Sequence, residues 1–405
     1  MKTQKSIFSE VYRYLEERSQ FVDKRHLNVL SWMVTALLSS QSLNQARWEP
    51  YVQSRAEQAN SYQRRWNRFC NNGRVAIEKI YIPLILSAIE IWKETGERLY
   101  LAIDTTLLWN EYCFVHLAVV CGGRAVPLMW IGLEHGSASI AFEKYEPFLD
   151  RAKGYLQNFE DVMLLADRGF ANQQLIQWLR KNAWHWCIRL PCDTLIYGVR
   201  RRGFGYEVRE LYPPKRQANF YRNVQVWQEA RLSAHLALAS VPGVQENWAI
   251  LTDEPPTLQT FWQYGLRFHI EHLFLDSKSG VFDWEHSRIR SETSLERLYL
   301  VVAISILFAT LTGMAVQQSG LRRQVDAHFR RGLSYLKIGL RWLVGVLQKN
   351  RPFLRLDHLF SVDPAPCFAS RKARQDYHFR ITFSRSYALT KSPKYVLLKK
   401  RRNSR

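Results

Sequence analysis

The feature that most constrains this chain is an uncharged run of 19 residues from Leu298 to Val316, LYLVVAISILFATLTGMAV. A helix of this length and composition either crosses a lipid bilayer or lies inside a large soluble fold. The run contains polar Ser305, Thr310 and Thr312, and no second segment of the chain resembles a span. We therefore expect a buried core helix in a soluble fold without a membrane partner, and a membrane span is the alternative.

The charge balance is strongly positive. Lys and Arg number 57 against 36 Asp and Glu, an excess of 57 − 36 = 21. Such a field attracts polyanions, and for a soluble chain the usual polyanion is nucleic acid. A merely basic soluble protein and a membrane-surface protein remain as alternatives. Hydrophobic residues make up 47% of the 405 residues, so the chain is not globally disordered and has enough residues for roughly two to four domains.

The cysteines and the N-terminal sequence bear on the compartment. No two of the six cysteines form a CxxC pair, which excludes the zinc-finger class. We expect ordinary buried thiols, which are typical of a reducing cytoplasm. The first ten residues, MKTQKSIFSE, lack the apolar core of a signal peptide. The expected location is therefore cytoplasmic.

Residues 1–95 are expected to form a helical DNA-binding domain. In the segment 61–70, Tyr62, Trp66 and Phe69 recur at helical spacing and define one apolar face. The other faces carry basic residues, namely Arg64, Arg65 and Arg68. Small helical domains with basic faces often dock on DNA. A solvated surface helix is the alternative.

Residues 96–190 are predicted to form the first part of a mixed α/β core. Apolar, β-forming segments separated by short polar or glycine-rich breaks predict three hairpin-connected strands, which are followed by alternating helices and strands. The predicted order is strands over 99–109, 112–121 and 124–133, a helix over 139–156, a strand over 162–168, a helix over 172–182 and a strand over 185–190.

Residues 191–247 interrupt this rhythm with prolines and short β-like segments, and we expect a β-rich insertion. Within it, GVRRRGFGYEVR (198–209) interleaves arginines with aromatic residues, a composition suited to phosphates and stacked bases. An exposed hairpin with solvated arginines is the alternative.

Residues 248–320 are expected to complete the core, with a strand over 248–252 and a long helix over about 258–277.

Residues 321–405 are expected to form a basic, helical C-terminal region and tail. The last fifteen residues, KSPKYVLLKKRRNSR, contain seven Lys or Arg and no acid. Such a tail is often a disordered nucleic-acid contact, and a solubilising end is the alternative.

Three acids occupy unusual places. Asp104 lies within an apolar strand, Asp167 ends the apolar segment VMLLAD, and Glu271 lies within the long helix. A lone buried carboxylate needs a cation or a strong hydrogen-bond partner. Acids at strand ends, completed by an acid on a helix, can hold Mg²⁺ ions for phosphoryl transfer. The alternative is that Asp104 is salt-bridged, Asp167 caps a turn and Glu271 faces solvent.

The helix that carries Glu271 adds a directional argument. At 100° per residue, Tyr264, Arg267, Glu271 and Lys278 fall within an arc of about 60°. A metal-binding acid flanked by cations on one stripe suits a DNA backbone, because the cations hold phosphates beside the ion. A helical salt bridge between Arg267 and Glu271 is the alternative. His269 and His272 raise a zinc interpretation, but they lack the H-E-x-x-H spacing.

These residues resemble a known family. The spacing Y-x2-R-x3-E-x6-K within YGLRFHIEHLFLDSK (264–278) is similar to the signature of bacterial cut-and-paste insertion-sequence transposases of the DDE type. AIDTT (102–106) and LADRGF (165–170) resemble the first and second acid motifs of that family, and WAILTDEP (248–255) resembles the strand and turn ahead of the third. The resemblance covers roughly residues 99–315. Phe268 and His269 depart mildly from the usual pattern.

The resemblance implies an RNase H-like catalytic core with a β-rich insertion between the second and third acids. Asp104, Asp167 and Glu271 would be the catalytic ligands of two Mg²⁺ ions, for which Mn²⁺ could substitute. DNA-binding roles would fall to Tyr264, Arg267, Lys278 and Trp248. Trp248 would fill the space left by a flipped base near the element end, and core packing is its alternative role.

The resemblance also implies a reaction. Metal-activated water cuts one strand at the element end, the freed 3′-OH closes a DNA hairpin that water reopens, and the 3′-OH then attacks target DNA. The partners would be the terminal repeats and target duplex, held by a homodimer in a synaptic complex near the bacterial nucleoid. A domesticated or inactive transposase that only binds DNA is the alternative, and a host RNase H-like nuclease is a third.

Overall fold

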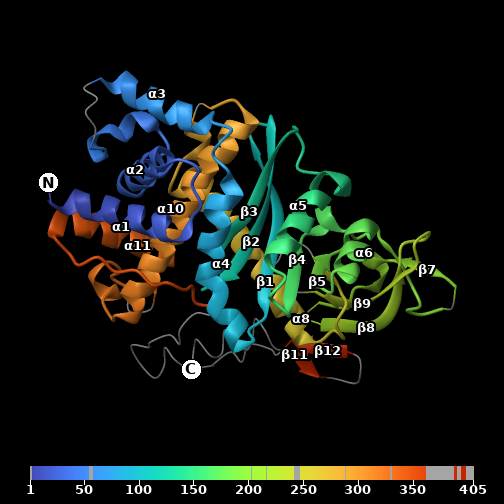
Figure 1. The fold of residues 1–405 in the computed structure, drawn as a ribbon. Helices are drawn as coiled ribbons and strands as arrows, with labels where there is room; N and C mark the ends of the chain where they lie inside the picture. The colour runs from blue at the N-terminus through green and yellow to red at the C-terminus, as the bar shows by residue number, and fades with distance from the viewer. Residues whose placement is uncertain are drawn as a thin grey trace.

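The computed structural model describes residues 2–53, 58–201, 203–215, 217–240, 247–287, 289–328, 331–361, 387–389 and 394–397. Its described strands join in one large mixed sheet with the order β11-β12-β8-β9-β10-β5-β4-β1-β2-β3, with β6 and β7 attached at β8. Helices pack on both sides of this sheet (Figure 1). The predicted mixed α/β class is therefore confirmed.

The half of the sheet that carries the first two acids is built from five strands. Hairpins connect β1 (Leu99–Leu108), β2 (Tyr112–Cys121) and β3 (Arg124–Glu134), which pair antiparallel. β4 (Val162–Ala166) then pairs parallel with β1, and β5 (His185–Arg189) pairs parallel with β4. The connecting helices are α5 (Phe142–Tyr155) and α6 (Gln173–Lys181). β2 lies between β1 and β3 and is buried along its whole length.

The uncharged run predicted as a core helix forms part of α10 (Glu292–Gln318). This is one described helix long and apolar enough to cross a membrane, and its most apolar 18-residue window is buried entirely inside the fold. α10 packs on β3, α2 (Lys24–Ser40) and α11 (Tyr335–Lys349). The contact with α11 is very close, because a Cβ added at Gly313 would lie 1.9 Å from the carbonyl oxygen of Tyr335. The buried-helix prediction is confirmed.

The N-terminal helices lie against α10 and α11 on one side of the molecule (Figure 1). They are α1 (Lys2–Arg18), α2, α3 (Ala59–Cys70) and α4 (Ile77–Thr95), with short 3-10 turns η1 (Gln45–Arg47) and η2 (Glu49–Tyr51) between α2 and α3. Tyr62, Trp66 and Phe69 of α3 are buried, as their spacing predicts. Arg64 and Arg68 are exposed and Arg65 is half-buried.

The segment predicted as an insertion is rich in strands and extends the core sheet. Its elements are β6 (Leu195–Tyr197), β7 (Gly205–Glu207), α7 (Val208–Leu211), β8 (Gln217–Val226) and β9 (Leu232–Ala239). β9 pairs with β10 (Trp248–Thr252), which pairs with β5, so the insertion continues the same hydrogen-bonded ladder. At the tip between β6 and β7, Phe204 is exposed and the Arg201 guanidinium lies 4.4 Å from its ring centroid.

The single helix predicted over 258–277 is wrong in detail. The segment consists of α8 (Leu258–Gly265), the 3-10 turn η4 (Leu266–Phe268), α9 (His269–Leu275) and the π-helical turn η5 (Asp276–Gly280). Two of the changes fall beside Gly265 and Gly280, and glycine lowers helix propensity. Tight 3-10 turns and wide π turns rotate side chains away from the positions of an ideal helix.

The C-terminal region differs from the helical prediction. After α10 the described chain has the short η7 (Arg322–Gln324) and α11, and residues 351–361 are not helical. β11 (Tyr387–Leu389) and β12 (Lys394–Leu397) add to the sheet, where β12 pairs with β8. Most of the basic tail lies outside the described residues. The helical prediction holds for α11 and is wrong for β11 and β12, because the pairing of β12 with β8 depends on a partner distant in sequence.

Candidate nucleic-acid processing site

Asp104 and Asp167 occupy corresponding places on neighbouring parallel strands. Ile103 of β1 pairs with Ala166 of β4, so each aspartate is the next residue beyond this pair. Neighbouring strands lie about 4.8 Å apart. The parallel register therefore places the first two acids side by side, with Asp104 inside β1 and Asp167 just after the end of β4.

Asp167 is fixed by the turn that follows β4. It caps the 3-10 turn η3 (Arg168–Phe170) and accepts a hydrogen bond from the backbone N–H of Gly169 at 2.7 Å. Its side chain is half-buried. Asp167 therefore does cap a turn, as the alternative interpretation of the sequence states. The single hydrogen bond from Gly169 leaves other lone pairs of the carboxylate for a cation.

The Arg267 guanidinium joins the first and third acids. Its Nη1 donates to Asp104 Oδ2 at 3.0 Å, and its Nη2 donates to Glu271 Oε1 at 2.7 Å. The side chains of Arg267 and Asp104 are 6% and 16% exposed, whereas that of Glu271 is 53% exposed. Together these residues and Asp167 form what we call the Asp104 cluster. The salt bridge between Arg267 and Glu271 that the sequence offered as an alternative is present. Arg267 also pairs with Asp104 on β1.

The pKa of Asp104 is raised from 3.8 to about 6. Burial is the largest cause, because it disfavours the ionised carboxylate. Arg267 and the N–H of Thr105 act in the opposite direction, and the negative charges of Asp167 and Glu271 raise the pKa further. One arginine therefore does not fully compensate the three acids, and the cluster favours additional positive charge.

His116 stands beside Asp104 and supplies no charge. It pairs with Asp104 across β1 and β2, and residues paired in an antiparallel ladder project on the same face of the sheet. Its ring is fully buried and lies 4.8 Å from the Tyr299 ring and 5.1 Å from the Phe274 ring, between centroids. Burial lowers the pKa of His116 to about 3, so the imidazole is neutral at pH 7.

Lys278 is tied to the same strand as Asp104. Its Nζ donates to the carbonyl oxygen of Leu107 at 2.6 Å and lies 3.1 Å from Glu285 Oε1. Lys278 belongs to the π turn η5, so its position is not that of an ideal continuous helix. It nevertheless faces β1, as the predicted stripe requires. Its phosphate-binding role stays a prediction.

Tyr264 and Trp248 lie in an aromatic group rather than on an open surface. Tyr264 has no exposed surface, and its ring centroid is 5.4 Å from that of Trp248 and 5.9 Å from that of Phe268. Trp248 is half-buried. Tyr264, predicted on the same stripe as Arg267 and Glu271, is thus buried, and its contact with DNA stays a prediction. Core packing explains its burial, and a DNA contact would require the aromatic group to open.

The donor set of the Asp104 cluster suits a hard divalent cation, since carboxylate oxygens are the ligands that Mg²⁺ prefers. In the part of the chain that the structure describes, no three His, Cys, Asp or Glu side chains lie close enough to hold an ion as they stand. The Arg267 guanidinium takes the place of a cation between Asp104 and Glu271. The residue types fit the predicted ions, and the side chains must rearrange to admit them.

A basic cavity of about 720 Å³ lies away from the sheet, between α2 and α3. It is lined by Arg64, Arg65 and Arg68, which the sequence singled out, and by Arg25 and Arg74, which it did not. Asn72 joins its two walls, because its side-chain nitrogen lies 2.8 Å from His26 Nε2. No pattern in the sequence connects Arg25 with α3, since they meet only through tertiary packing.

A second charged group lies where β1 and β4 begin. Arg98 donates two hydrogen bonds to Asp161 and two to Glu254, at 2.7–2.9 Å. His185 Nδ1 lies 2.6 Å from Asp253 Oδ2. We call these five residues the Arg98 cluster. Hydrogen bonding to Arg98 holds the pKa of Glu254 below its ordinary value.

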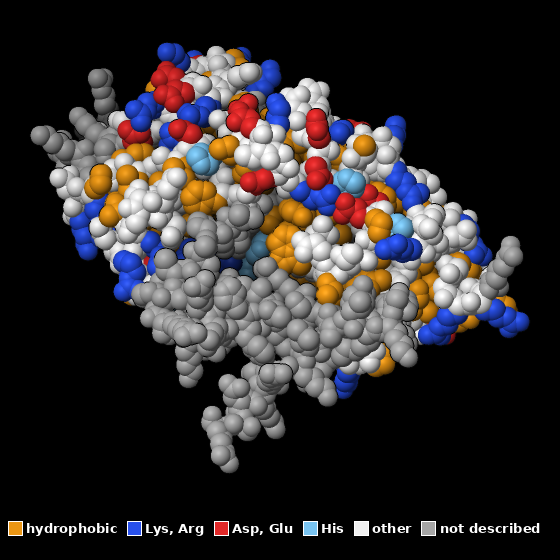
Figure 2. All heavy atoms as spheres, turned by 90° about the horizontal axis from the view of Figure 1, so that it is seen from below, with side chains coloured by type: hydrophobic (Ala, Val, Ile, Leu, Met, Phe, Trp, Pro, Cys, Tyr) orange, Lys and Arg blue, Asp and Glu red, His pale blue; other side chains and the backbone are white. Residues whose placement is uncertain are grey.

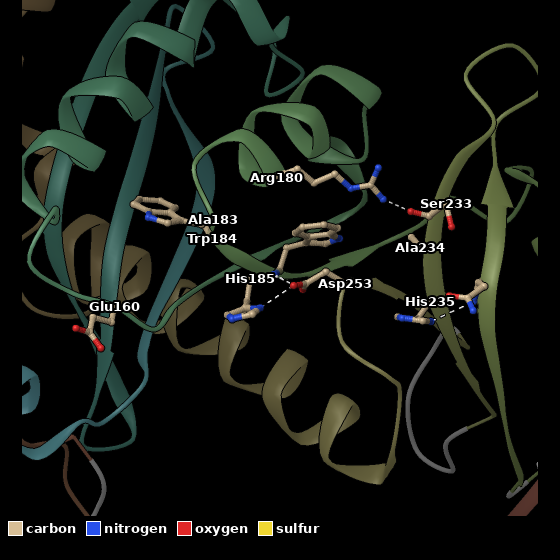
Figure 3. Close-up of a pocket in the computed structure, with 11 residues that line it drawn as sticks. Glu160, Arg180, Ala183, Trp184, His185, Ser233, Ala234, His235 and Asp253 are labelled. Carbon is tan, nitrogen blue, oxygen red and sulfur yellow. Dashed lines mark hydrogen bonds and ion pairs between the residues drawn. The ribbon is translucent and has the colours of Figure 1, made fainter.

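The Arg98 cluster borders a cavity of about 550 Å³. Figure 3 shows His185 turned toward Asp253, and Arg180 turned toward Ser233 on the far wall. Seen from below, the molecule shows acidic, basic and histidine side chains gathered near the middle of the face (Figure 2). Because its acids are paired with described partners, the Arg98 cluster has the character of a structural network.

Comparisons with known proteins bear on the Asp104 cluster. Residues 111–308 match the family model of the Transposase DDE domain. The matched range contains Asp167, Arg267, Glu271 and Lys278, and it begins just after Asp104. The comparison with curated proteins found no match.

Among solved structures, the chain is similar to a piggyBac transposase in a synaptic complex with hairpin DNA. The two share 9% sequence identity with a TM-score of 0.40, over 92% of this chain and 82% of the other. The segment from 111 to 308, which supplies two of the three acids and both cations of the signature, thus carries the sequence pattern of a Transposase DDE domain.

Proposed function

We propose that this protein is a DDE transposase that excises and inserts a DNA element. The observation that carries the proposal is the convergence of Asp104 and Asp167, from neighbouring parallel strands, with Glu271, which one arginine bridges to Asp104. The match of residues 111–308 to the Transposase DDE domain supports it. The three hairpin strands followed by two parallel strands agree with the RNase H-like core that the sequence resemblance implies.

Asp104, Asp167 and Glu271 would hold two Mg²⁺ ions, or Mn²⁺ in their place. Bound there, such ions activate an attacking oxygen and stabilise the leaving oxygen in phosphoryl transfer. The chain's own residues position the substrate. Arg267 and Lys278 would hold strand phosphates, which requires each to leave an acid that it contacts in this structure. The acids and cations thus exchange partners when DNA arrives.

The proposed DNA partners are the element's terminal repeats and its target duplex, bound by a homodimer in the bacterial cytoplasm. Both ends must be cut and joined together, which favours two copies of the site. Arg64, Arg65 and Arg68 supply a basic cavity surface that suits duplex phosphates. A hairpin at the excised end is the proposed intermediate, and Trp248 would then support the flipped base.

The test is cleavage of an end-labelled duplex carrying the inverted repeats that bracket the gene. With Mg²⁺, the wild type should give a nicked strand and then a hairpin. Asp104→Asn, Asp167→Asn and Glu271→Gln should bind the duplex and cut it roughly 10³-fold more slowly. Asp253→Asn, in the Arg98 cluster, is the matched control and should cut like the wild type. Full cleavage by Glu271→Gln would contradict the site assignment.

The DNA-binding alternative, a transposase that has lost cleavage, is distinguished by the same assay. In that case the wild type would bind the repeats and leave them uncut with Mg²⁺ or Mn²⁺. Cutting of arbitrary duplexes without paired ends would instead favour a host nuclease. The retained acids and their convergence favour the active enzyme.

A further inference from the structure

Three cations follow one another along β1. Arg267 contacts Asp104, Lys278 contacts the carbonyl oxygen of Leu107, and Arg290 lies over the ring of Trp109, directly after the strand. The first two belong to the predicted signature. Arg290 belongs to no motif in the sequence. It adds a third cation after Arg267 and Lys278, at the residue that follows β1.

Trp109 is held in an unusual backbone conformation. Trp109 and Asn110 have φ of 52° and 58°, and the N–H of Glu111 donates to the carbonyl oxygen of Leu108 at 3.0 Å. These two residues therefore form the tight turn between β1 and β2. Asn tolerates this left-handed region, whereas a bulky tryptophan is strained there. Strain of this kind is often retained at functional sites.

The strained turn is tied to the segment that carries Arg290. Trp109 Nε1 donates to the carbonyl oxygen of Glu285 at 3.1 Å, and the side chain of Glu285 contacts Lys278. The Arg290 guanidinium carbon lies 3.6 Å from the centroid of the Trp109 ring. Lys278, Trp109 and Arg290 are thus parts of one connected structure at the end of β1.

This stacking prepares Arg290 for an anion. Arg290 is exposed, and its described hydrogen bond is from Nη1 to the carbonyl oxygen of Ile289. The Trp109 ring covers one side of the Arg290 guanidinium and leaves further N–H donors of the group, which can bind a phosphate with two bonds. The indole also fixes the arginine before binding, which reduces the entropy lost on binding.

We propose that Arg290, held on Trp109, is a DNA phosphate clamp at the end of β1. The proposal rests on the proposed function, because it takes the DNA held at the Asp104 cluster as its ligand. Trp109 lies five positions after Asp104, roughly 16 Å along the strand at about 3.3 Å per residue. For a duplex along β1, this distance corresponds to about five base pairs at 3.4 Å each.

The test measures binding of a duplex carrying the element end, across a series of salt concentrations. Arg290→Ala should weaken binding about tenfold and reduce the slope of log K against log salt by about 0.9. Arg290→Lys should keep the slope and bind more weakly, because a lysine loses the two-bond geometry. Trp109→Asn suits the turn conformation and removes the ring, and it should also weaken binding with the slope kept.

The control is Arg151→Ala on α5, whose side chain pairs with Glu78 at 2.8 Å and should leave binding and slope unchanged. Thermal melting of each variant confirms folding. Ethylation of single phosphates should reveal one position, about five base pairs from the cut, that matters for the wild type and not for Arg290→Ala. If the wild type cuts DNA and Arg290→Ala has the same salt slope and the same ethylation pattern as the wild type, the phosphate clamp is overturned and the proposed function is not. A wild type that neither binds nor cuts overturns the proposed function as well.

Discussion

Two charged clusters lie along β1, one at its start and one around its middle, and they differ in how their acids are compensated. In the Arg98 cluster, one arginine gives two hydrogen bonds to each of two acids, and the pKa of Glu254 is lowered. In the Asp104 cluster, Arg267 gives one hydrogen bond to each of two acids, and the pKa of Asp104 is raised to about 6. The first arrangement stabilises the fold, whereas the second retains negative charge that suits a cation.

The largest expected difference between the clusters is their response to pH. Asp104 has a pKa of about 6 in the folded protein and 3.8 as its ordinary value. The folded state therefore holds this proton more tightly, so stability is present below pH 4 and is lost as the pH rises through 6, by about 3 kcal/mol at most. Asp104→Asn should remove this loss. Urea unfolding of both proteins between pH 4 and 8 measures it, and an unchanged profile in Asp104→Asn would contradict the assignment.

Glu254 should show the opposite sign. Its lowered pKa stabilises the fold above its ordinary pKa, and this stability is lost as the pH falls through the folded value. Glu254→Gln should therefore flatten the acid limb of the same unfolding profile and leave the region around pH 6 unchanged. The two variants together distinguish the clusters, because Asp104 lowers the stability of the fold as the pH rises and Glu254 lowers it as the pH falls.

A smaller effect is expected from removing the arginine that closes the Arg98 cluster. Arg98→Ala leaves two half-buried acids, Asp161 and Glu254, without their main partner. We expect a loss of about 2 kcal/mol in the free energy of unfolding at pH 7. Arg98→Lys is the matched control, since it keeps the charge without the paired geometry and should lose less. Equal stability of Arg98→Ala and the wild type would show that the network is not structural.

Periodicity and strand patterns predicted much of the Asp104 cluster. Helical spacing placed Arg267 near Glu271, and the strand pattern placed Asp104 and Asp167 on apolar strands, because both features depend on local sequence. The buried α10 followed from its uncharged length. These predictions needed no knowledge of contacts between distant segments.

The remaining features depend on tertiary contacts. Arg98 meets Glu254 across 156 residues, and Arg267 meets Asp104 across 163. The burial of Tyr264 follows from packing against Trp248, and the basic cavity needs Arg25 from a different helix. The sequence predicted a strand over 99–109 that includes Trp109, and it revealed neither the place of Trp109 in the strained turn nor its contact with Arg290.

The central claim is that the Asp104 cluster, and not the Arg98 cluster, holds divalent cations. Electron paramagnetic resonance of Mn²⁺ added to the purified protein measures this directly, without DNA or turnover. The account predicts that the wild type and Asp253→Asn bind Mn²⁺, and that Asp104→Asn, Asp167→Asn and Glu271→Gln each lose most of that binding. Unchanged Mn²⁺ binding in these three variants, or its loss in Asp253→Asn, would contradict the account.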